Sequence, residues 1–301
     1  MKKKNPLTQL ILRSCTRRFF ALTLLSFIAF SVNARTIHWI TFINTDDPHV
    51  GSMDQNARKT LYGSLIDVVN SETSQYNYDC IIYDYYSGSF NPIECKTCLD
   101  NLNCDTTDII VFYFIGHGMR LSDDNAHSKY PHLFFDNRYE NSIPLSWIHQ
   151  TLKNKGARLT LTFAVCDNSY LGVDGKPIIE DVPLPIVNRI QNDSSLEEHD
   201  NSSLAKAFLG YKGDMIVCSA SPGQHTWGMQ TDLGPMDLFT YSLASYFGNI
   251  NSDNVMLWPD IIESISSQIT DATKSSFNSV QTPAYDYSLD QIQMPKRDNN
   301  R

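Results

Sequence analysis

Two stretches of this sequence decide its fold: Thr107–Arg120, which reads TDIIVFYFIGHGMR, and Arg158–Gly172, which reads RLTLTFAVCDNSYLG. Each begins with an apolar run of β-branched and aromatic residues, and each run has the length of a buried strand. Each run ends in a reactive side chain, His117 between two glycines and Cys166 before a polar turn. Ligands of parallel sheets bind at the carboxyl ends of the strands, so adjacent strands would bring these side chains together from 49 residues apart.

His117 and Cys166 form a candidate base and nucleophile. A thiol needs a base or a cationic neighbour to become a useful nucleophile, and an imidazole is the commonest one. Gly118 leaves its backbone N–H accessible, and that amide together with the N–H of Cys166 would stabilise an oxyanion. The alternative is that Cys166 is a small core residue and His117 a turn residue, because free cysteines are among the most buried residues. Their joint position at two strand ends favours the catalytic interpretation.

The rest of the chain alternates between strand and helix patterns. Apolar runs predict strands at Thr36–Ile43, Tyr78–Tyr86, Asp108–Ile115, Arg158–Val165 and Asp214–Ala220. Helical spacing predicts helices at Asn56–Ser71, Pro92–Leu102, Pro144–Lys155, Leu204–Leu209, Met236–Phe247 and Trp258–Lys274. A small hairpin is expected at His132–Asp136 and Tyr139. This alternation is typical of an α/β fold, in which helices cover both faces of a parallel sheet.

The first 34 residues have the pattern of an export signal. A basic leader without acids precedes the apolar run Phe19–Val32, and the segment 32–34 offers a small-residue cleavage site. Fourteen apolar residues are short for a bilayer span, which needs about 20, so an uncleaved anchor is the lesser alternative. Thr16–Phe20 also resembles a twin-arginine signal, and the residues before Cys15 argue against a lipoprotein. We therefore expect a signal peptide at 1–34 and an exported protein that is periplasmic, cell-surface or secreted.

The charge of the chain limits its partners. The whole sequence has a formal net charge of −9, and removal of the leader would leave 18 Lys and Arg against 33 Asp and Glu, a net charge of −15. Such a surface repels nucleic acid and anionic membranes, so neither is expected as a partner. No break in composition divides the rest of the chain, which fits one large α/β domain.

Six cysteines follow the leader, and three of them lie close together in the sequence: Cys95, Cys98 and Cys104. In an exported protein, one local disulfide among these three is the first expectation, and free thiols are the second. A redox or metal site at the CKTC tetrad comes third, because zinc needs a second ligand pair and none follows. No metal site is therefore expected. Cys218 lies in an apolar run and is expected in the core.

The two deciding stretches resemble the His and Cys motifs of the caspase and metacaspase family of cysteine peptidases. IGHG at 115–118 is similar to the family's strand–Gly–His–Gly, and AVCDNSYLG at 164–172 lies where metacaspases carry their Cys motif. A His about 50 residues before the Cys is a known caspase spacing, although the caspase string Q-A-C-[RQG]-G is absent. IVCSASPGQHTWG at 216–228, DLFTYSLASYF at 237–247 and SVQTPAY at 279–285 resemble the small-subunit strand, helix and ending of bacterial caspase-like proteins.

This resemblance implies a three-layer α/β sandwich with a mainly parallel six-stranded sheet flanked by helices. It also implies these boundaries: a peptidase domain at 35–290, made of a large-subunit part at 35–172, a linker at 173–203 and a small-subunit part at 204–290, then a polar tail at 291–301. Family zymogens are often activated by a cut in this linker. If the enzyme prefers basic residues, Lys176 or Arg189 would be cut, and the alternative is an uncut insertion.

The activity that the resemblance implies is that of a cysteine endopeptidase acting on a protein or peptide. Cys166 would attack the carbonyl, His117 would assist the proton transfers, and the backbone N–H groups of Gly118 and Cys166 would hold the oxyanion. No cofactor is required for this chemistry. Calcium activates many metacaspases and is the one cofactor that the resemblance allows, although Asp123 and Asp124 are too ordinary a pair to define a site. The sequence does not indicate an oligomeric state.

The expected substrate pocket differs from both branches of the family. Metacaspases place an Asp two residues before the Cys to bind Arg or Lys, and this chain has Ala164 there. Caspases hold an Asp substrate with two arginines, and this chain has His49, Val50 and Gly228 at those places. The overall resemblance still favours a basic substrate residue, with His49, Ala164 and Trp227 lining the pocket. Three acids are candidates for its charge: Asp46, Asp47 and Asp232.

Three alternatives to this peptidase stay open. One is a catalytically silent caspase-like protein that binds a partner, and another is a peptidase resembling legumain or the clostripain-like enzymes, with a different preference. The third is a structural α/β protein with a chance His and Cys. No residue that orients His117 is identifiable from the sequence, and His127 and His132 are expected to be solvated loop residues.

Overall fold

The computed structural model describes residues 35–121, 128–135, 141–170, 202–248, 257–277 and 279–297. The following expectations lie outside these residues: the signal peptide at 1–34, Asp123, Asp124, His127, Asp136, Tyr139, and almost all of the linker 173–203 with Lys176 and Arg189. Among the described helices, none is long and apolar enough to cross a membrane.

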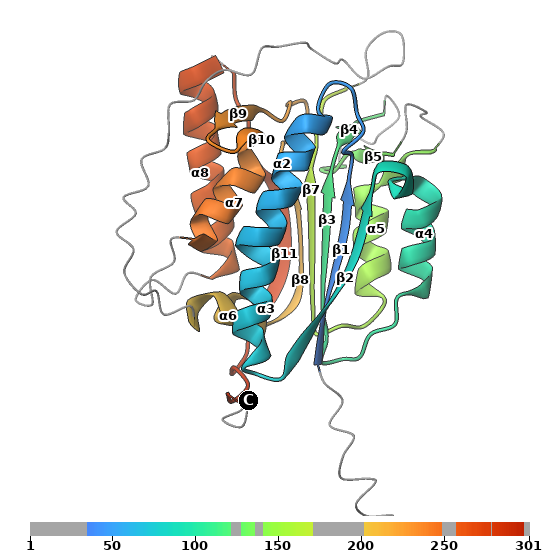
Figure 1. Cartoon of the computed structure of the whole chain (residues 1–301), viewed down its shortest axis with the longest axis vertical. Coiled ribbons are helices and arrows are strands. Elements are labelled where there is room, and N and C mark those ends of the chain that lie inside the picture. The colour runs from blue at the N-terminus through green and yellow to red at the C-terminus, as the bar shows by residue number, and fades with distance from the viewer. Residues whose placement is uncertain are drawn as a thin grey trace, which may run out of the picture. The chain divides into compact units, whose positions relative to one another are not determined.

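A six-stranded mixed sheet forms the centre of the described domain (Figure 1). Its strands are, in spatial order, β11 (Ala284–Gln291), β8 (Tyr211–Cys218), β7 (Leu159–Val165), β3 (Ile109–Ile115), β1 (Arg35–Ile43) and β2 (Tyr78–Tyr86). All neighbouring pairs are parallel except β11 with β8, which is antiparallel. The predicted strands are confirmed within three residues at each end. The strand β11 is not among the five strands predicted from the sequence; the family resemblance implied a sixth strand without placing it.

Helices cover both faces of this sheet (Figure 1). One layer contains α2 (Gly51–Leu61), a π-helical turn (Tyr62–Ile66), α3 (Asp67–Ser74), α6 (Ser202–Leu209), α7 (Leu238–Gly248) and α8 (Trp258–Phe277). The other layer contains α4 (Pro92–Asn101) and α5 (Leu145–Lys153). The predicted three-layer α/β sandwich with a mainly parallel sheet is therefore confirmed.

The core follows from the alternation of side chains along fully buried strands. In β3, Val111 and Tyr113 face the layer of α2 and α7, whereas Phe112 and Phe114 face the layer of α4 and α5. Every residue of β3 and β7 is buried, which is why their sequences read as continuous apolar runs. These two buried, paired strands position the residues that follow them.

The first helical segment begins earlier than its apolar spacing predicts. The helix expected from Asn56 begins at Gly51, and it continues through the π-helical turn and α3 to Ser74. A Cβ atom at Gly51 would lie 2.6 Å from the backbone oxygen of Thr45, so only glycine allows the chain to enter the helix this closely. Ser52, Asp54 and Gln55 interrupt the apolar spacing, so the periodicity did not reveal this first turn.

One other prediction about local structure was wrong. Met236 and Asp237 were expected in a helix but form the end of β10 (Gly234–Asp237), which pairs with β9 (Gly228–Thr231) as a hairpin. The described part of the expected hairpin, β5 (His132–Phe134), pairs antiparallel with β4 (His117–Met119) and β6 (Ile143–Pro144), whereas Asp136 and Tyr139 lie outside the described residues. As a consequence, His117 is the first residue of a paired strand.

The expected local disulfide is absent from the structure, in which all six described cysteines are free. Cys95 and Cys98 lie one helical turn apart on α4 and are buried in the core between that helix and the sheet. Cys104 lies after the helix, where its thiol donates to the backbone oxygen of Lys155 at 3.4 Å. The three thiols are therefore free in this structure, which was the second expectation.

Candidate active site

The ends of β3 and β7 bring His117 and Cys166 to the same edge of the sheet. The two strands are parallel neighbours, and Ile115 lies opposite Val165 at the last pair of the register. The backbone N–H of Gly116 donates to the oxygen of Val165 at 3.2 Å, so the two chains stay together beyond the strands. The adjacency that the two sequence stretches predict is therefore confirmed.

Gly118 packs directly against the thiol. A Cβ atom built at Gly118 would lie 2.5 Å from Sγ of Cys166 and 2.6 Å from the backbone oxygen of Asp167. Real Cβ atoms do not approach other atoms so closely, so any side chain at this position would displace the thiol or the backbone behind it. The glycine after His117 is thus required by the thiol of the neighbouring strand.

His117 is held by a carboxylate, which the sequence analysis had not assigned to this role. Its Nε2 lies 3.0 Å from Oδ2 of Asp47, and the two side chains are only 16% and 9% exposed. The other carboxylate oxygen of Asp47 accepts the backbone N–H groups of His49 at 2.8 Å and Val50 at 3.0 Å. Both carboxylate oxygens of Asp47 are therefore used within the protein.

The pKa values of this pair shift apart. Burial alone would raise the pKa of Asp47, but the hydrogen bonds from His117 and from the Val50 and His49 amides outweigh it and hold the pKa well below its usual range. Burial alone would lower the pKa of His117, but the hydrogen bond and the charge of Asp47, with a contribution from Asp167, raise it. The geometry thus favours an ionised carboxylate that accepts the Nε2–H of His117.

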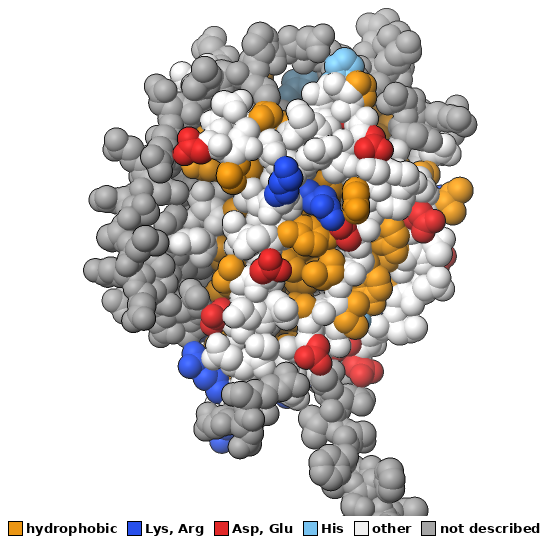
Figure 2. All heavy atoms as spheres, viewed as in Figure 1, with side chains coloured by type: hydrophobic (Ala, Val, Ile, Leu, Met, Phe, Trp, Pro, Cys, Tyr) orange, Lys and Arg blue, Asp and Glu red, His pale blue; other side chains and the backbone are white. Residues whose placement is uncertain are grey.

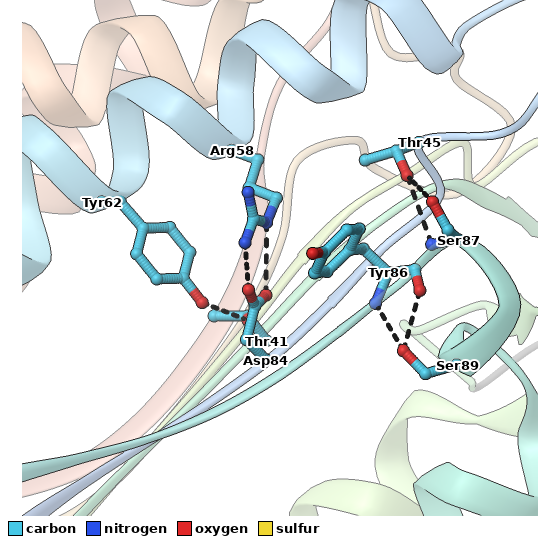
Figure 3. A network of polar contacts seen from close by, with 8 residues as sticks. All are labelled: Thr41, Thr45, Arg58, Tyr62, Asp84, Tyr86, Ser87 and Ser89. Atoms are coloured by element: carbon cyan, nitrogen blue, oxygen red, sulfur yellow. Dashed lines mark hydrogen bonds and ion pairs between the residues drawn. The ribbon is translucent and has the colours of Figure 1, made fainter.

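The loop that carries Asp47 is tied to the end of the edge strand β2 (Figure 3). Oγ of Ser87 lies 3.1 Å from Oγ1 of Thr45, and the backbone N–H of Ser87 donates to the same Thr45 oxygen at 3.2 Å. The hydroxyl of Ser87 also donates to Oδ1 of Asp46 at 2.8 Å. Asp46 therefore fixes the loop, whereas its neighbour Asp47 faces His117.

A second part of the network in Figure 3 anchors α2, the helix that begins after this loop. Arg58 on α2 pairs through its guanidinium with both carboxylate oxygens of Asp84 on β2, and Thr41 on β1 donates to the same carboxylate at 2.9 Å. The guanidinium also lies over the rings of Tyr62, at 4.8 Å, and Tyr86, at 4.2 Å. Burial opposes ionisation of Asp84, yet the hydrogen bonds from Arg58, Tyr62 and Thr41 lower its pKa.

Cys166 has an environment unlike that of His117. Its side chain is buried with Cys218 and Ala284 in the core of the α4 and α5 layer, and only 2% of the residue is exposed. Burial, followed by the neighbouring Cys218, raises the pKa of this thiol well above its usual range. Although both residues are described, no hydrogen bond joins Sγ of Cys166 to His117.

The backbone of Cys166 is bonded to the segment that follows β8. Its N–H, which was predicted to donate to an oxyanion, donates to Oγ of Ser219 at 3.0 Å. Its carbonyl oxygen accepts the hydroxyls of Thr226 at 2.8 Å and Ser219 at 3.2 Å. In this structure, the Cys166 amide is therefore engaged within the protein.

The next residue, Asp167, connects the same two segments, and sequence reasoning did not single it out. Its carboxylate accepts the backbone N–H of Thr226 at 2.6 Å and lies 3.3 Å from Nδ1 of His225. Gln281 also binds this segment: its side-chain oxygen accepts the backbone N–H of Trp227, and its side-chain nitrogen donates to the backbone oxygen of Ser219. The Gln-Thr-Pro ending quoted above thus contacts the segment after β8.

The expected pocket residues lie in different environments. His49 is exposed on the loop between Asp47 and α2, and Trp227 is half-buried beside the core of the α7 layer. Ala164 is buried in β7 with 1% exposure, so in this structure it faces the core of the α4 and α5 layer. Among the other acids proposed for the pocket, Asp232 is exposed at the turn between β9 and β10.

His132 was expected to be a solvated loop residue, and it lies instead in β5. It stands opposite Met119 in the ladder with β4, and its Nδ1 lies 3.2 Å from the hydroxyl of Ser142. It is therefore part of the small sheet that continues from His117.

Comparisons with known proteins add little to this geometry. No protein-family model matches the chain, and no curated protein matches it. A similar solved structure is protein GSU0716 from Geobacter sulfurreducens, at 11% identity and a TM-score of 0.45 over 84% of this chain and 93% of that one. Another is the Drosophila initiator caspase Dronc, at 12% identity and a TM-score of 0.40 over 84% of this chain and 79% of that one. Likenesses at these TM-scores carry no inference about activity.

Proposed function

We propose that this protein is a cysteine endopeptidase in which Cys166 is the nucleophile and His117 the general acid and base. The observation that carries the proposal is the contact between the two strand ends, where the backbone after His117 packs against the thiol of Cys166. A thiol and an imidazole held by a carboxylate, together at the carboxyl edge of a parallel sheet, are the groups that acyl transfer requires.

The reaction would proceed in two steps. The sulfur of Cys166, after loss of its proton to His117, attacks the substrate carbonyl carbon, and the C–N bond breaks as His117 returns that proton to the leaving amine. The resulting thioester is then attacked by water, which gives a proton to His117, and the C–S bond breaks to release the acid and the thiol. The N–H of Gly118 is the proposed oxyanion donor next to the thiol.

Asp47 has a positioning role in this proposal. Because its carboxylate accepts a hydrogen bond from Nε2–H of His117, Nδ1 is the ring nitrogen that exchanges a proton with the thiol and the leaving amine. The same bond stabilises the imidazolium that forms while the proton resides on His117. The carboxylate itself stays ionised throughout.

The proposal requires a rearrangement around Cys166. The buried thiol has a raised pKa, and its backbone N–H is bonded to Ser219, so the described conformation represents a closed state. We propose that release of the segment 219–227 exposes the thiol and frees its amide. A cut in the linker 173–203, as the family resemblance implies, is the proposed trigger, and a basic residue before the scissile bond is the proposed preference.

One alternative function has an observation in its favour. The burial of Cys166 and the lack of a hydrogen bond to His117 within the described residues fit a protein that binds a partner without catalysis. The two functions differ in one measurable property, because only the peptidase must expose the thiol at some stage.

The test uses the full chain and a preparation nicked within 173–203, each with and without calcium, in reducing buffer. Fluorogenic peptides ending in Arg, Lys, Asp, Asn or an apolar residue are the substrates, and Cys166→Ala and His117→Ala are the variants. We expect hydrolysis that both variants abolish and that the matched control Cys98→Ala retains. If neither preparation cleaves any peptide, or if Cys166→Ala is as active as the parent, the proposed peptidase is wrong and the binding function gains support.

A further inference from the structure

The edge strand β2 has features that the proposed peptidase does not use. It pairs along all its nine residues with β1, and no other described strand pairs with its outer side. Its sequence, YDCIIYDYY, contains no Pro, Lys or Arg, which are the residues that commonly prevent an edge strand from pairing with another chain. The outer backbone groups of β2 are thus open to a further strand.

Both faces of this edge expose apolar side chains. Ile81 is 43% exposed on the side of α4, while Ile82 is 42% and Tyr86 43% exposed on the side of α2. Figure 2 shows hydrophobic side chains gathered on the part of the surface where β2 lies in Figure 1. An edge that is apolar on both faces gains contact area on both sides when a strand is added.

The opposite edge strand, β11, likewise contains two aspartates and no Pro, Lys or Arg, but both of its aspartates are strongly exposed and Tyr287 is its one strongly exposed apolar side chain. The side chains of Asp286 and Asp290 on β11 are 60% and 76% exposed, and each pairs with a lysine of its own chain. Exposed charges of this kind disfavour strand addition. On β2, Asp79 is exposed, whereas the side chain of Asp84 is only 19% exposed and forms an ion pair with Arg58 of the same chain.

We propose that two copies of this chain pair through β2, antiparallel, with Ile82 on the two-fold axis. This register is the one that pairs all nine residues, placing Tyr78 opposite Tyr86 of the second copy. Ile82 then meets Ile82 on one face, and Ile81 meets Tyr83 of the second copy on the other. Pairs of β-branched and aromatic residues are among the most favourable across two strands.

The charges of β2 agree with this register. Asp79 falls opposite Tyr85 of the second copy and Asp84 opposite Cys80, so no carboxylate faces another one. A shift by one residue would place Asp79 opposite Asp84. It would also place the α2 face of one copy on the same side of the joined sheet as the α4 face of the other copy. The dimer therefore has a single preferred register, which can be tested at its axis.

The first test measures the mass of the full chain in solution by sedimentation velocity. We expect about twice the 34.2 kDa of the chain. Ile82→Lys places two like charges opposite each other at the axis and should weaken the dimer by about tenfold or more. The matched control, Ser288→Lys on the outer strand β11, should leave the dimer unchanged, and far-ultraviolet circular dichroism checks that both variants fold.

The second test reads the register and does not depend on a disruptive variant. In a Cys80→Ala background, Ile82→Cys should form a disulfide between two copies when a copper–phenanthroline oxidant is added. Ile81→Cys should not, because its opposite residue is Tyr83. A monomer for the unsubstituted chain at high micromolar concentration overturns the proposal, and so does equal crosslinking by the two cysteine variants. Neither result bears on peptide hydrolysis, so this proposal and the proposed function can fail separately.

Discussion

The two strand ends that meet at the candidate site differ in how well their reactive side chains are arranged for the proposed reaction. At the end of β3, His117 has a carboxylate partner at 3.0 Å and a raised pKa. At the end of β7, Cys166 is buried, its pKa is also raised, and its N–H is bonded to Ser219. For an imidazole that must take up a proton, the raised pKa is favourable. For a thiol that must lose one, it is unfavourable.

This difference indicates where the proposed activity would be controlled. The residues around His117 belong to loops tied to β2 and α2, and the proposal requires no rearrangement of them. The residues around Cys166 belong to the segment after β8, whose hydrogen bonds must break before the thiol can react. In this proposal, the base side is preformed, and the change from the closed to the proposed open state takes place on the nucleophile side.

The largest effect is expected from Gly118→Ala, which inserts an atom between the two sides. The new Cβ would lie 2.5 Å from Sγ of Cys166 and 2.6 Å from the Asp167 oxygen. We expect a loss of peptide hydrolysis of about 100-fold, because small displacements of reacting groups have effects of this size. We also expect a decrease of about 1–3 kcal/mol in the free energy of unfolding, measured with urea.

Gly63→Ala is the matched control for Gly118→Ala, because a Cβ there meets nothing within 4 Å. It should leave hydrolysis unchanged. If both glycine variants behaved alike, the close approach of the two strand ends would have no bearing on activity.

The next effect tests the surroundings of His117 alone. Asp47→Asn keeps an oxygen for the His49 and Val50 amides but removes the charge that raises the pKa of His117. We expect hydrolysis to fall by about tenfold or more and the His117 ring to titrate at lower pH in proton NMR spectra. Asp46→Asn is the control, since Asp46 bonds to Ser87 and makes no contact with His117. An unchanged His117 titration in Asp47→Asn would remove Asp47 from its proposed role.

A smaller effect is expected from a change beside Cys166. Ser219→Ala removes the acceptor of the Cys166 N–H and a donor to its carbonyl oxygen. We expect a decrease of about 1 kcal/mol in stability and roughly fivefold faster alkylation of Cys166 by iodoacetamide, followed by mass spectrometry. Ser221→Ala, which changes a side chain without a bond to Cys166, should not change the rate. Slower or equal alkylation in Ser219→Ala would mean that this bond does not keep the thiol closed.

The smallest effect concerns the pH dependence of stability and the buried carboxylate of Asp237 at the end of β10. Burial raises the pKa of Asp237 from 3.8 to about 6, although the amide and hydroxyl of Thr240 lower it in part. The folded state therefore binds this proton more tightly than the unfolded state, so stability decreases as pH rises from about 4 through about 6. Asp237→Asn should flatten the pH dependence of the urea midpoint in this window. A curve as steep as that of the parent would exclude Asp237 as its source.

Much of the sheet could be predicted because β3 and β7 are buried on both faces. Their apolar runs have the length of strands, and the reactive residues at their ends follow directly from the alternation of strands and helices. The contact between Gly118 and Cys166 also agrees with the prediction that these strands are neighbours. Local pattern was sufficient where burial alone determines the residue type.

The rest of the site depends on the order of strands, which local pattern does not contain. Asp47 reaches His117 because β1 lies beside β3, with Ile43 opposite Ile115, and Asp47 follows β1 by four residues. A usable signal was its position at the carboxyl end of a predicted strand. Ser219 reaches Cys166 only because β8 lies beside β7. The disulfide prediction failed for a similar reason, since closeness in sequence does not show where the side chains of a helix point.

The two roles of Asp47 make this position hard to interpret from comparisons among relatives. One oxygen of its carboxylate holds His117, and the other fixes the turn from which α2 begins. Natural selection for a correctly folded helix and selection for an oriented imidazole would therefore retain the same residue. A relative without the proposed activity would still have a reason to keep the aspartate, so its presence indicates a shared architecture rather than a shared reaction.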